Sequence, residues 1–175
     1  LIFTPDANAH GAAYSSFTFQ VQDDGGTANG GVDLDQTPNT ITFNVESVND
    51  APSGADKTIN TAEDTPYSLS ISDFGFTDSL DSPSNSLIAV RITSLPTAGT
   101  LTLDGAAVTA GQFISAADIA AGKLIFTPDA NAHGAAYSSF TFQVQDDGGT
   151  ANGGVDLDQS PNTITFNVES VNDAP

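Results

Sequence analysis

The chain repeats a long part of itself almost without change. Residues 1–52 recur as residues 124–175, and across these 52 positions a single residue differs, Thr37 against Ser160. The offset between the copies is 123 residues, so the chain holds one full repeating unit and part of another. A long period with near identity indicates a tandem array. Near-identical copies favour a role in which copy number matters, such as a spacer or a multivalent surface.

The phrase Asn-Asp-Ala-Pro marks the boundary between units. It follows a strand-like run at residues 49–52 and again at residues 172–175. Proline ends such a strand, and Asn-Asp before it favours a turn. We therefore interpret the phrase as a linker. Residues 1–50 are then expected to be the C-terminal half, strands E to G, of a preceding repeat, and residues 51–175 one complete repeat.

Short apolar runs separated by turn residues predict an all-β fold, a Greek-key β-sandwich of cadherin-like or immunoglobulin-like type in a tandem array. The 11 Phe and 38% hydrophobic residues are enough for a packed core. Alternation places Ile88, Val90 and Ile92 on one face of the third strand. The expected strands are 57–62, 67–74, 87–95, 100–103, 123–127, 139–145 and 163–171, with a helical turn at 115–122.

The strands expected in residues 1–50 need other strands to pair with. Strands E to G alone leave an apolar face and sheet edges uncovered. Because the two copies are nearly identical, residues 53–123 could pair with either one. The expected partners are therefore neighbouring identical repeats, with a domain-swapped or strand-complementing copy as an alternative. The sequence leaves open whether residues 1–50 pair with 53–123, with another molecule or with a further segment.

The charge balance is strongly acidic and constrains function. The chain carries 22 acidic and 3 basic residues, for a formal net charge of −19, and no Cys. Phosphate binding needs clustered bases, so no nucleic-acid partner is predicted. No apolar run is long enough to predict membrane insertion. The self-repulsion of this charge favours divalent cations as counterions, and calcium suits carboxylate oxygens and irregular geometry better than magnesium does.

Acidic and amide residues fall in the loops at the two ends of the predicted sandwich. In a sandwich with alternating strand directions, the loops after residues 74 and 145 lie at the same end as the incoming linker. The alternative interpretation is that these residues are solvated turn residues. The predicted calcium site at the linker comprises Asn49, Asp50, Asp78, Asp81, Asp146 and Asp147. The candidate ligands at the opposite end are Glu63, Asp64, Asn172 and Asp173. Asp23 and Asp24 are the first-copy equivalents of Asp146 and Asp147, without the partner loop.

No catalytic constellation stands out, and no enzyme is predicted. Paired carboxylates could serve a glycosidase, but the chain has no Trp and only 3 Tyr to form a sugar platform. His10 and His133 occupy one repeat position and are interpreted as turn residues. The Gly-Gly pairs lack the Lys of a phosphate-binding loop.

An ordered set of short motifs carries a family resemblance. The set is Asn49–Pro52, Glu63–Pro66, Phe76–Asp78, Leu124–Asp129 and Val144–Gly149. It resembles the bacterial cadherin-like tandem repeats of very large surface adhesins, including those secreted with calcium-binding C-terminal repeats, the RTX adhesins. The resemblance implies calcium at the junctions, with roles for Asn49, Asp50 and Glu63. Many relatives have a compact Asp-x-Asp-Gly-Asp loop, which is spread here over Asp78, Asp81 and Asn85.

The resemblance implies a calcium-stabilised extender, or stalk, repeat of an adhesin secreted to the bacterial cell surface, which projects an adhesive tip. The alternative is a repeat that itself binds polysaccharide or self-associates in cell–cell or biofilm adhesion. Outward-facing positions of the expected strands are mostly Ser, Thr, Gln and Asn, which favours the spacer.

Overall fold

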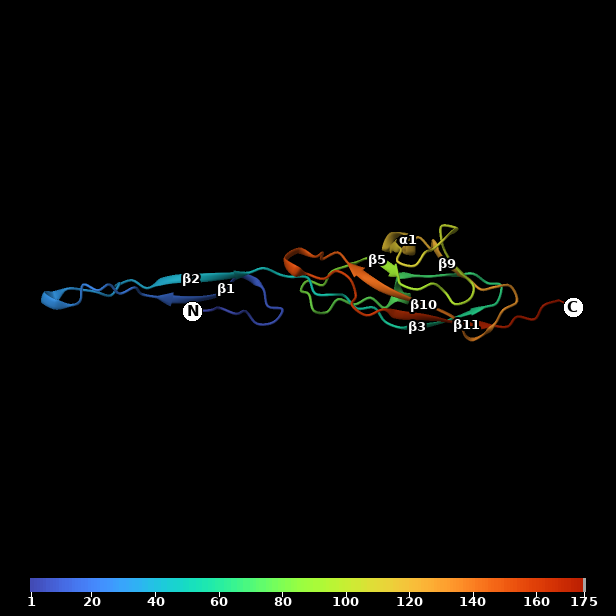
Figure 1. Ribbon diagram of the computed structural model, residues 1–175, viewed down its shortest axis with the longest axis horizontal. Coiled ribbons are helices and arrows are strands. Elements are labelled where there is room, and N and C mark those ends of the chain that lie inside the picture. Colours follow the sequence, from blue (N-terminus) through green and yellow to red (C-terminus); the bar gives the residue numbers. More distant parts are fainter. Residues whose placement is uncertain (175) are drawn as a thin grey trace. The chain divides into compact units, whose positions relative to one another are not determined.

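The computed structural model describes residues 1–174 and divides the chain into two compact units, Leu1–Val48 and Asn49–Pro175 (Figure 1). Pro175, the last residue of the second linker phrase, lies outside the described residues. The first unit contains β1 (Gly11–Phe19), the 3-10 turn η1 (Ala28–Gly30) and β2 (Asn39–Val45). Its two strands form an antiparallel hairpin.

The second unit is a two-layer β-sandwich, which confirms the predicted all-β fold. One sheet has the order β3-β11-β10-β5-β8 and the other the order β4-β9-β6-β7. All strand pairs are antiparallel except β3 with β11. The strands are β3 (Lys57–Ala62), β4 (Tyr67–Ser68), β5 (Leu87–Ile92), β6 (Thr100–Leu103), β7 (Ala106–Ala107), β8 (Phe113–Ser115), β9 (Leu124–Thr127), β10 (Gly134–Asp146) and β11 (Asn162–Glu169). The helical elements are η2 (Ile71–Phe74), α1 (Ala116–Ala120) and η3 (Ala151–Gly153).

The core of the second unit is rich in phenylalanine. Phe126 stacks on Phe166 with ring centroids 3.8 Å apart, and Phe74 meets Phe142 edge-on at 4.9 Å. These four rings and Phe140 are fully buried. Aromatic side chains bury large apolar areas, so a few of them dominate the packing energy of a small sandwich. The core holds the two sheets together, and the loops at each end start from fixed positions.

The predicted strand at 67–74 is wrong over most of its length. Pairing stops at Ser68, and the chain turns into η2. The Asp73 carboxylate accepts hydrogen bonds from the backbone N–H and the hydroxyl of Ser70, at 2.8 Å each. Such local side-chain bonds compete with a strand. Ile71, the first residue of η2, is consequently exposed.

The predicted inner face of the third strand is wrong at one residue. Val90 and Ile92 are buried, whereas Ile88 is 43% exposed. The register of β5 against β10 shifts between the pairs Ala89–Gln145 and Leu87–Asp146. Ile88 is therefore the extra residue of a β-bulge, which period-2 alternation cannot detect.

Other boundaries also differ from the prediction. β5 ends at Ile92 rather than at residue 95, and β10 runs from Gly134 rather than from residue 139. The short strands β7 and β8 were not predicted. The expected helical turn is present as α1, where the Ser115 hydroxyl accepts from the Asp118 N–H at 3.0 Å. This hydrogen bond is the N-cap of α1.

Candidate functional site

Acidic and amide side chains from three separate segments meet at the end of the sandwich where the linker enters. They come from the linker, from the loop between η2 and β5, and from the end of β10. We call this group the linker cluster, and it comprises Asn49, Asp50, Asp78, Asp81, Asn85, Asp146 and Asp147. The structure thus brings together the six residues that the sequence placed in one site.

Asn49 is the hub of the cluster. Its amide nitrogen donates to Asp146 Oδ1 at 3.0 Å and to the Val155 carbonyl at 2.7 Å. Its amide oxygen accepts from Asn85 Nδ2 at 2.6 Å. Its backbone carbonyl accepts from the Val155 N–H at 2.9 Å. One linker residue therefore ties together both loops of this end of the domain.

The acids hold the other contacts of the linker. The Asp50 N–H donates to Asp81 Oδ2 at 2.9 Å. The Asp147 carboxylate accepts from the Ser86 N–H at 2.7 Å, which joins the end of β10 to the loop before β5. These bonds join the linker to the loop before β5, and that loop to the end of β10.

Two of the carboxylates are buried and incompletely satisfied. Asp146 is 0% exposed and Asp78 is 8% exposed. One oxygen of Asp78 accepts from the Asn85 N–H, and one oxygen of Asp146 accepts from Gly148 N–H at 2.9 Å. The remaining oxygens, Asp78 Oδ1 and Asp146 Oδ2, have no hydrogen-bond partner among the described residues. Removing an uncompensated charge from water costs several kcal/mol.

The electrostatics of the cluster call for a positive counter-charge. Burial raises the pKa of Asp146, and the neighbouring Asp78 and Asp156 charges add to the increase. Burial also raises the pKa of Asp81, to which Asp78 and Asp50 contribute. The Lys123–Asp118 and His133–Glu63 ion pairs lie elsewhere in the domain. A bound cation would remove the mutual repulsion that these carboxylates now carry.

The donor chemistry fits a hard divalent cation, although the side chains are not pre-arranged as a complete ligand set. Within residues 1–174, no three Asp, Glu, His or Cys side chains are placed to hold a metal ion. The unpartnered oxygens of Asp78 and Asp146 are suitable ligands, and the half-buried Asp50 and Asp81 are further oxygen donors. Calcium accepts six to eight oxygens in irregular geometry, including amide and backbone oxygens.

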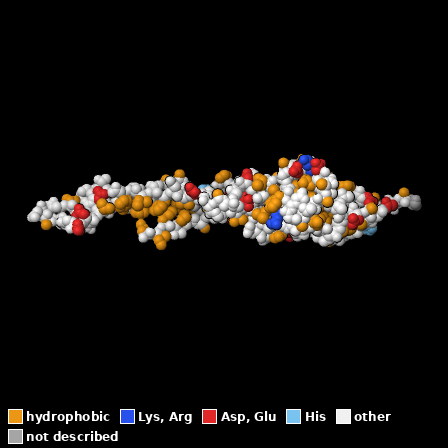
Figure 2. All heavy atoms as spheres, turned by 45° about the horizontal axis from the view of Figure 1, so that its top comes forward, with side chains coloured by type: hydrophobic (Ala, Val, Ile, Leu, Met, Phe, Trp, Pro, Cys, Tyr) orange, Lys and Arg blue, Asp and Glu red, His pale blue; other side chains and the backbone are white. Residues whose placement is uncertain are grey.

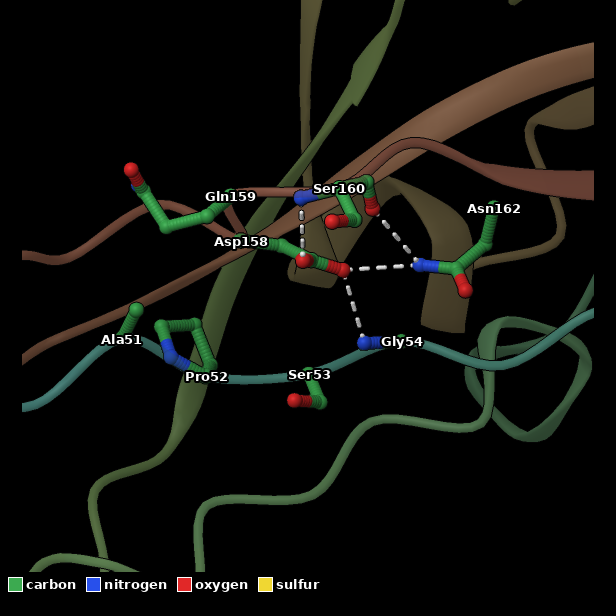
Figure 3. A pocket seen from close by; sticks show the side chains of 8 residues that line it. All are labelled: Ala51, Pro52, Ser53, Gly54, Asp158, Gln159, Ser160 and Asn162. Atoms are coloured by element: carbon green, nitrogen blue, oxygen red, sulfur yellow. Dashed lines mark hydrogen bonds between the residues drawn. The ribbon is translucent and has the colours of Figure 1, made fainter.

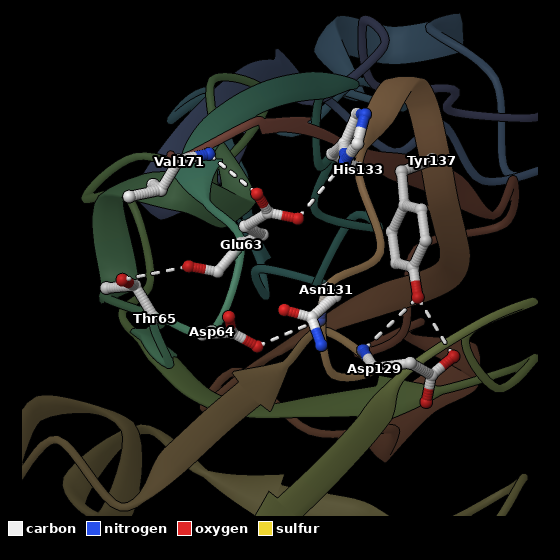
Figure 4. A network of polar contacts seen from close by, with 8 residues as sticks. All are labelled: Glu63, Asp64, Thr65, Asp129, Asn131, His133, Tyr137 and Val171. Carbon is white, nitrogen blue, oxygen red and sulfur yellow. Dashed lines mark hydrogen bonds and ion pairs between the residues drawn. The ribbon is translucent and has the colours of Figure 1, made fainter. Parts of the chain in front are cut away.

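A second polar network lies at the other predicted end site (Figure 4). Glu63 is buried, and its carboxylate accepts from the Val171 N–H at 2.6 Å. Its second oxygen lies 3.1 Å from His133 Nδ1. The sequence indicated only a turn role for His133, because nothing local in the repeat shows that residues 70 positions apart meet.

The neighbouring residues of this network make structural hydrogen bonds. Asp64 accepts from the Asn131 N–H at 3.0 Å, and the Tyr137 hydroxyl donates to Asp129 at 2.9 Å (Figure 4). Asn172 and Asp173 lie exposed after Val171, and the Asn172 amide donates to the Asp173 carbonyl at 3.1 Å. Metal ligation by Glu63, Asp64, Asn172 and Asp173 stays a prediction.

The first unit shows the same acids in a different environment. Asp23 and Asp24 are exposed, and Asp23 Oδ1 accepts from the nearby Gly25 N–H at 2.9 Å. The counterpart Asp146 is buried against the linker and the loop after η2. No loop equivalent to residues 75–86 exists in the first unit. Ligation by Asp23 and Asp24 stays a prediction.

A shallow depression runs beside the linker (Figure 3). Its walls are the linker segment 51–54 and the segment 158–162. Asp158, which is buried, accepts from the N–H of Gly54 and of Ser160, at 2.9 Å each, and from Asn162 Nδ2 at 2.7 Å. Because this carboxylate is fully used by protein donors and no lining residue is aromatic, Asp158 anchors the linker.

Residues 49–158 match the family of bacterial Ig domains. The match spans more than half of the chain, and it begins at the hub residue Asn49. The chain belongs to the bacterial Ig domain family. Neither a curated protein nor a solved structure matches the chain. Bacterial Ig domains are generally extracellular or exposed on the cell surface, and their sandwich fold is typically non-enzymatic. Among the described residues, no helix has the length and apolarity needed to cross a membrane.

A substitution at Gly148 tests the packing of the linker against the bacterial Ig domain. A Cβ atom at Gly148 would overlap the side-chain amides of Asn49 and Asn85. Gly148→Ala is therefore expected to lower the free energy of unfolding of the domain by about 1–3 kcal/mol, the usual cost of overpacking. Urea denaturation followed by circular dichroism measures it.

Gly25 is the matched control for this substitution, since it occupies the same repeat position in the first unit. A Cβ atom there would meet only the Asp23 carboxylate, at 3.1 Å. Gly25→Ala is expected to change the domain's free energy of unfolding by less than about 0.5 kcal/mol. Equal losses from the two variants would contradict the packing assigned to Asn49.

The Glu63 carboxylate is expected to make the free energy of unfolding of the Ig domain decrease at acidic pH. The hydrogen bond from Val171 N–H lowers its pKa, and His133 lowers it further, against the opposing effect of burial. A carboxyl group with a depressed folded-state pKa stabilises the fold above its unfolded pKa of about 4.3, and the stabilisation is lost as the pH falls through the lower folded value. In an NMR titration, the Glu63 carboxyl midpoint is expected below that of a free Glu. A midpoint at or above the free value would refute this assignment, and Glu63→Gln should lose less stability between pH 5 and pH 3 than the parent.

Proposed function

We propose that this bacterial Ig domain is a calcium-stabilised extender repeat in the stalk of a secreted bacterial surface adhesin, where it projects an adhesive tip from the cell. One observation carries the proposal: two buried carboxylate oxygens without partners, on Asp78 and Asp146, lie where the linker enters the domain. Repetition of the linker phrase at residues 49–52 and 172–175 supports a serial arrangement in which each domain receives a linker.

The chain's own residues prepare the entrance for an ion. Asn49 fixes the linker to the end of β10 and to the loop before β5, and Asp50 and Asp81 bring further carboxylates alongside. Calcium, when bound, supplies the positive charge that this group lacks. Repulsion between the carboxylates then no longer weakens the hydrogen bonds of the linker, and the linker becomes a fixed part of the domain.

The expected affinity suits an extracellular device. Calcium sites in extracellular modules commonly have dissociation constants of about 10⁻⁴–10⁻³ M. A stalk with such sites would be stiff outside the cell and flexible where calcium is scarce. The surroundings of Asp158 support a spacer over a polysaccharide-binding repeat, since the depression there offers no aromatic platform.

Small-angle scattering of the full chain, in calcium and in chelator, tests the proposal. Calcium is expected to increase the radius of gyration and to narrow the distribution of interatomic distances, with binding seen by calorimetry. Asp78→Asn should abolish the change, whereas Asp104→Asn, at an exposed turn, should leave it intact. Scattering that is identical in both buffers would end the extender proposal. Capture of polysaccharide or calcium-independent self-association would favour the alternative role in adhesion.

A further inference from the structure

We propose that the first unit is an acceptor surface for a polypeptide segment with the sequence of residues 53–123, the first part of an identical repeat, supplied from outside this chain's own Ig domain. We call residues 1–48 the acceptor hairpin and residues 53–123 the donor segment. This interaction goes beyond the extender function, and its test does not use calcium binding. Its evidence is the comparison of two nearly identical sequences in two environments.

The acceptor hairpin already has the form that the donor segment recognises. β1 pairs with β2 through Phe17–Ile41 and Ser15–Phe43, and β10 pairs with β11 through the equivalent residues, each 123 positions later. Both hairpins have a register irregularity at the same place. Phe3 stacks on Phe43 at 4.1 Å, as Phe126 stacks on Phe166 at 3.8 Å. The hairpin thus forms without the donor segment.

What the acceptor hairpin lacks is cover for its apolar face. Phe19 and Ile41 are 36% and 41% exposed, whereas their equivalents Phe142 and Ile164 are 0% exposed. Figure 2 shows hydrophobic side chains gathered on the surface of the β1–β2 unit. Since the local sequence is the same, the donor segment is what buries these residues in the Ig domain. Burial of apolar surface is the main favourable term in such an association.

The strand edges of the acceptor hairpin lack the partner strands that their counterparts have in the Ig domain. In the Ig domain, β5 pairs along β10, β3 pairs along β11, and β4 and β6 flank β9. All four of these partner strands belong to the donor segment. In the first unit, β1 and β2 form a sheet of two strands, and residues 1–4, the counterpart of β9, form no strand. Open edges pair readily with added strands.

Exchange between two copies of residues 1–175 leaves the number of covered hairpins unchanged. These 175 residues contain one donor segment and two copies of the hairpin, in residues 1–48 and residues 124–174. If two copies trade donor segments, one hairpin is covered and another is exposed. An additional donor segment, in the same polypeptide or in another, changes that balance.

Charge does not select the occupant of the acceptor hairpin. The hairpin carries six acidic residues and no Lys or Arg, namely Asp6, Asp23, Asp24, Asp33, Asp35 and Glu46. The donor segment carries three basic residues but also eight acidic ones, so both have a net negative charge. The occupant is therefore identified by strand pairing and apolar burial, because β3 to β6 make these contacts with the second copy of the hairpin.

The test adds the donor segment, made as a separate polypeptide of residues 53–123, to the intact 175-residue chain. Hydrogen exchange is read by mass spectrometry in peptides that contain Thr37 or Ser160, the one position at which the two copies differ in mass. Exchange in β2 is expected to slow by about 100-fold or more on saturation, while β11 is unchanged. Native mass spectrometry is expected to show one added segment per chain.

Two variants locate the binding. Ile41→Asp in the acceptor hairpin should abolish the added protection while the Ig domain stays folded. Val90→Asp in the added segment should do the same, because Val90 is buried against the β10 position in the Ig domain. If the separate segment aggregates, a chain with residues 53–123 fused directly ahead of Leu1 replaces the mixture, and the same Thr37 peptide is read.

The proposal is overturned if the Thr37 peptide exchanges equally fast with and without donor segment, in the mixture or, where the segment aggregates, in the fusion. It is also overturned if protection already develops with chain concentration alone, since a second copy would then be the occupant. Scattering that does not respond to calcium would end the extender proposal and leave this one standing.

Discussion

Replacing Phe166 by alanine is expected to lower the free energy of unfolding of the Ig domain by about 3–5 kcal/mol. Phe166 lies in the middle of β11, is fully buried, and stacks on Phe126 at 3.8 Å. It also approaches Phe140 and Tyr67, each at a centroid distance of 6.2 Å. Truncation would leave a cavity surrounded by aromatic rings from both sheets, which cannot collapse without moving them. Urea denaturation measures the loss.

The repeat provides a matched control in Phe43. Phe43 has the same neighbours in sequence and stacks on Phe3, but it is only half-buried. Phe43→Ala should leave the unfolding transition of the Ig domain within about 0.5 kcal/mol of the parent. A large loss from Phe43→Ala, or a small one from Phe166→Ala, would show that the donor segment does not create the core environment.

Calcium is expected to raise the stability of the Ig domain strongly. At a free concentration 100 times the dissociation constant, a ligand that binds only the folded state adds about 2.7 kcal/mol. For a domain of this size, this corresponds to an increase in melting temperature of about 10 °C. Differential scanning calorimetry in calcium and in chelator measures the shift, with magnesium as the comparison cation.

Asp146→Asn should remove that calcium effect and at the same time stabilise the calcium-free domain. The amide keeps an oxygen for the Asn49 and Gly148 donors but removes the buried charge. Asp23→Asn is the control, because Asp23 occupies the same repeat position and is exposed. Calcium stabilisation that survives in Asp146→Asn at full size would contradict the assignment of this carboxylate as a ligand.

Much of the fold follows from local pattern. The boundaries of β3 and β6 agree with the alternation of apolar and polar residues, and the helix at Ser115 follows from its capping residues. The failures have local physical causes. Ser70 and Asp73 bond to each other and end a strand, and an extra residue at Ile88 turns that side chain outward. A bulge depends on the partner strand, so one strand's sequence does not reveal it.

The position of the linker cluster could be predicted from the sequence, because alternating strand directions determine which loops share an end of the sandwich. This rule places Asn49, Asp78 and Asp146 at the same end. The contacts themselves were not predictable: that Asn49 would bond both loops, or that one oxygen on each buried carboxylate would lack a partner. The His133–Glu63 pair was missed for the same reason, since a contact across 70 positions depends on how two loops fold toward each other.

The sequence by itself determined that the chain is a repeated, acidic β-sandwich, because period, composition and alternation are properties of residues in order. Tertiary structure decided which copy of each residue is buried. Phe43 and Phe166, or Asp23 and Asp146, share their neighbours in sequence and differ in exposure. Burial depends on what packs against a residue from elsewhere in the chain, and residues 53–123 pack against the second copy of the hairpin.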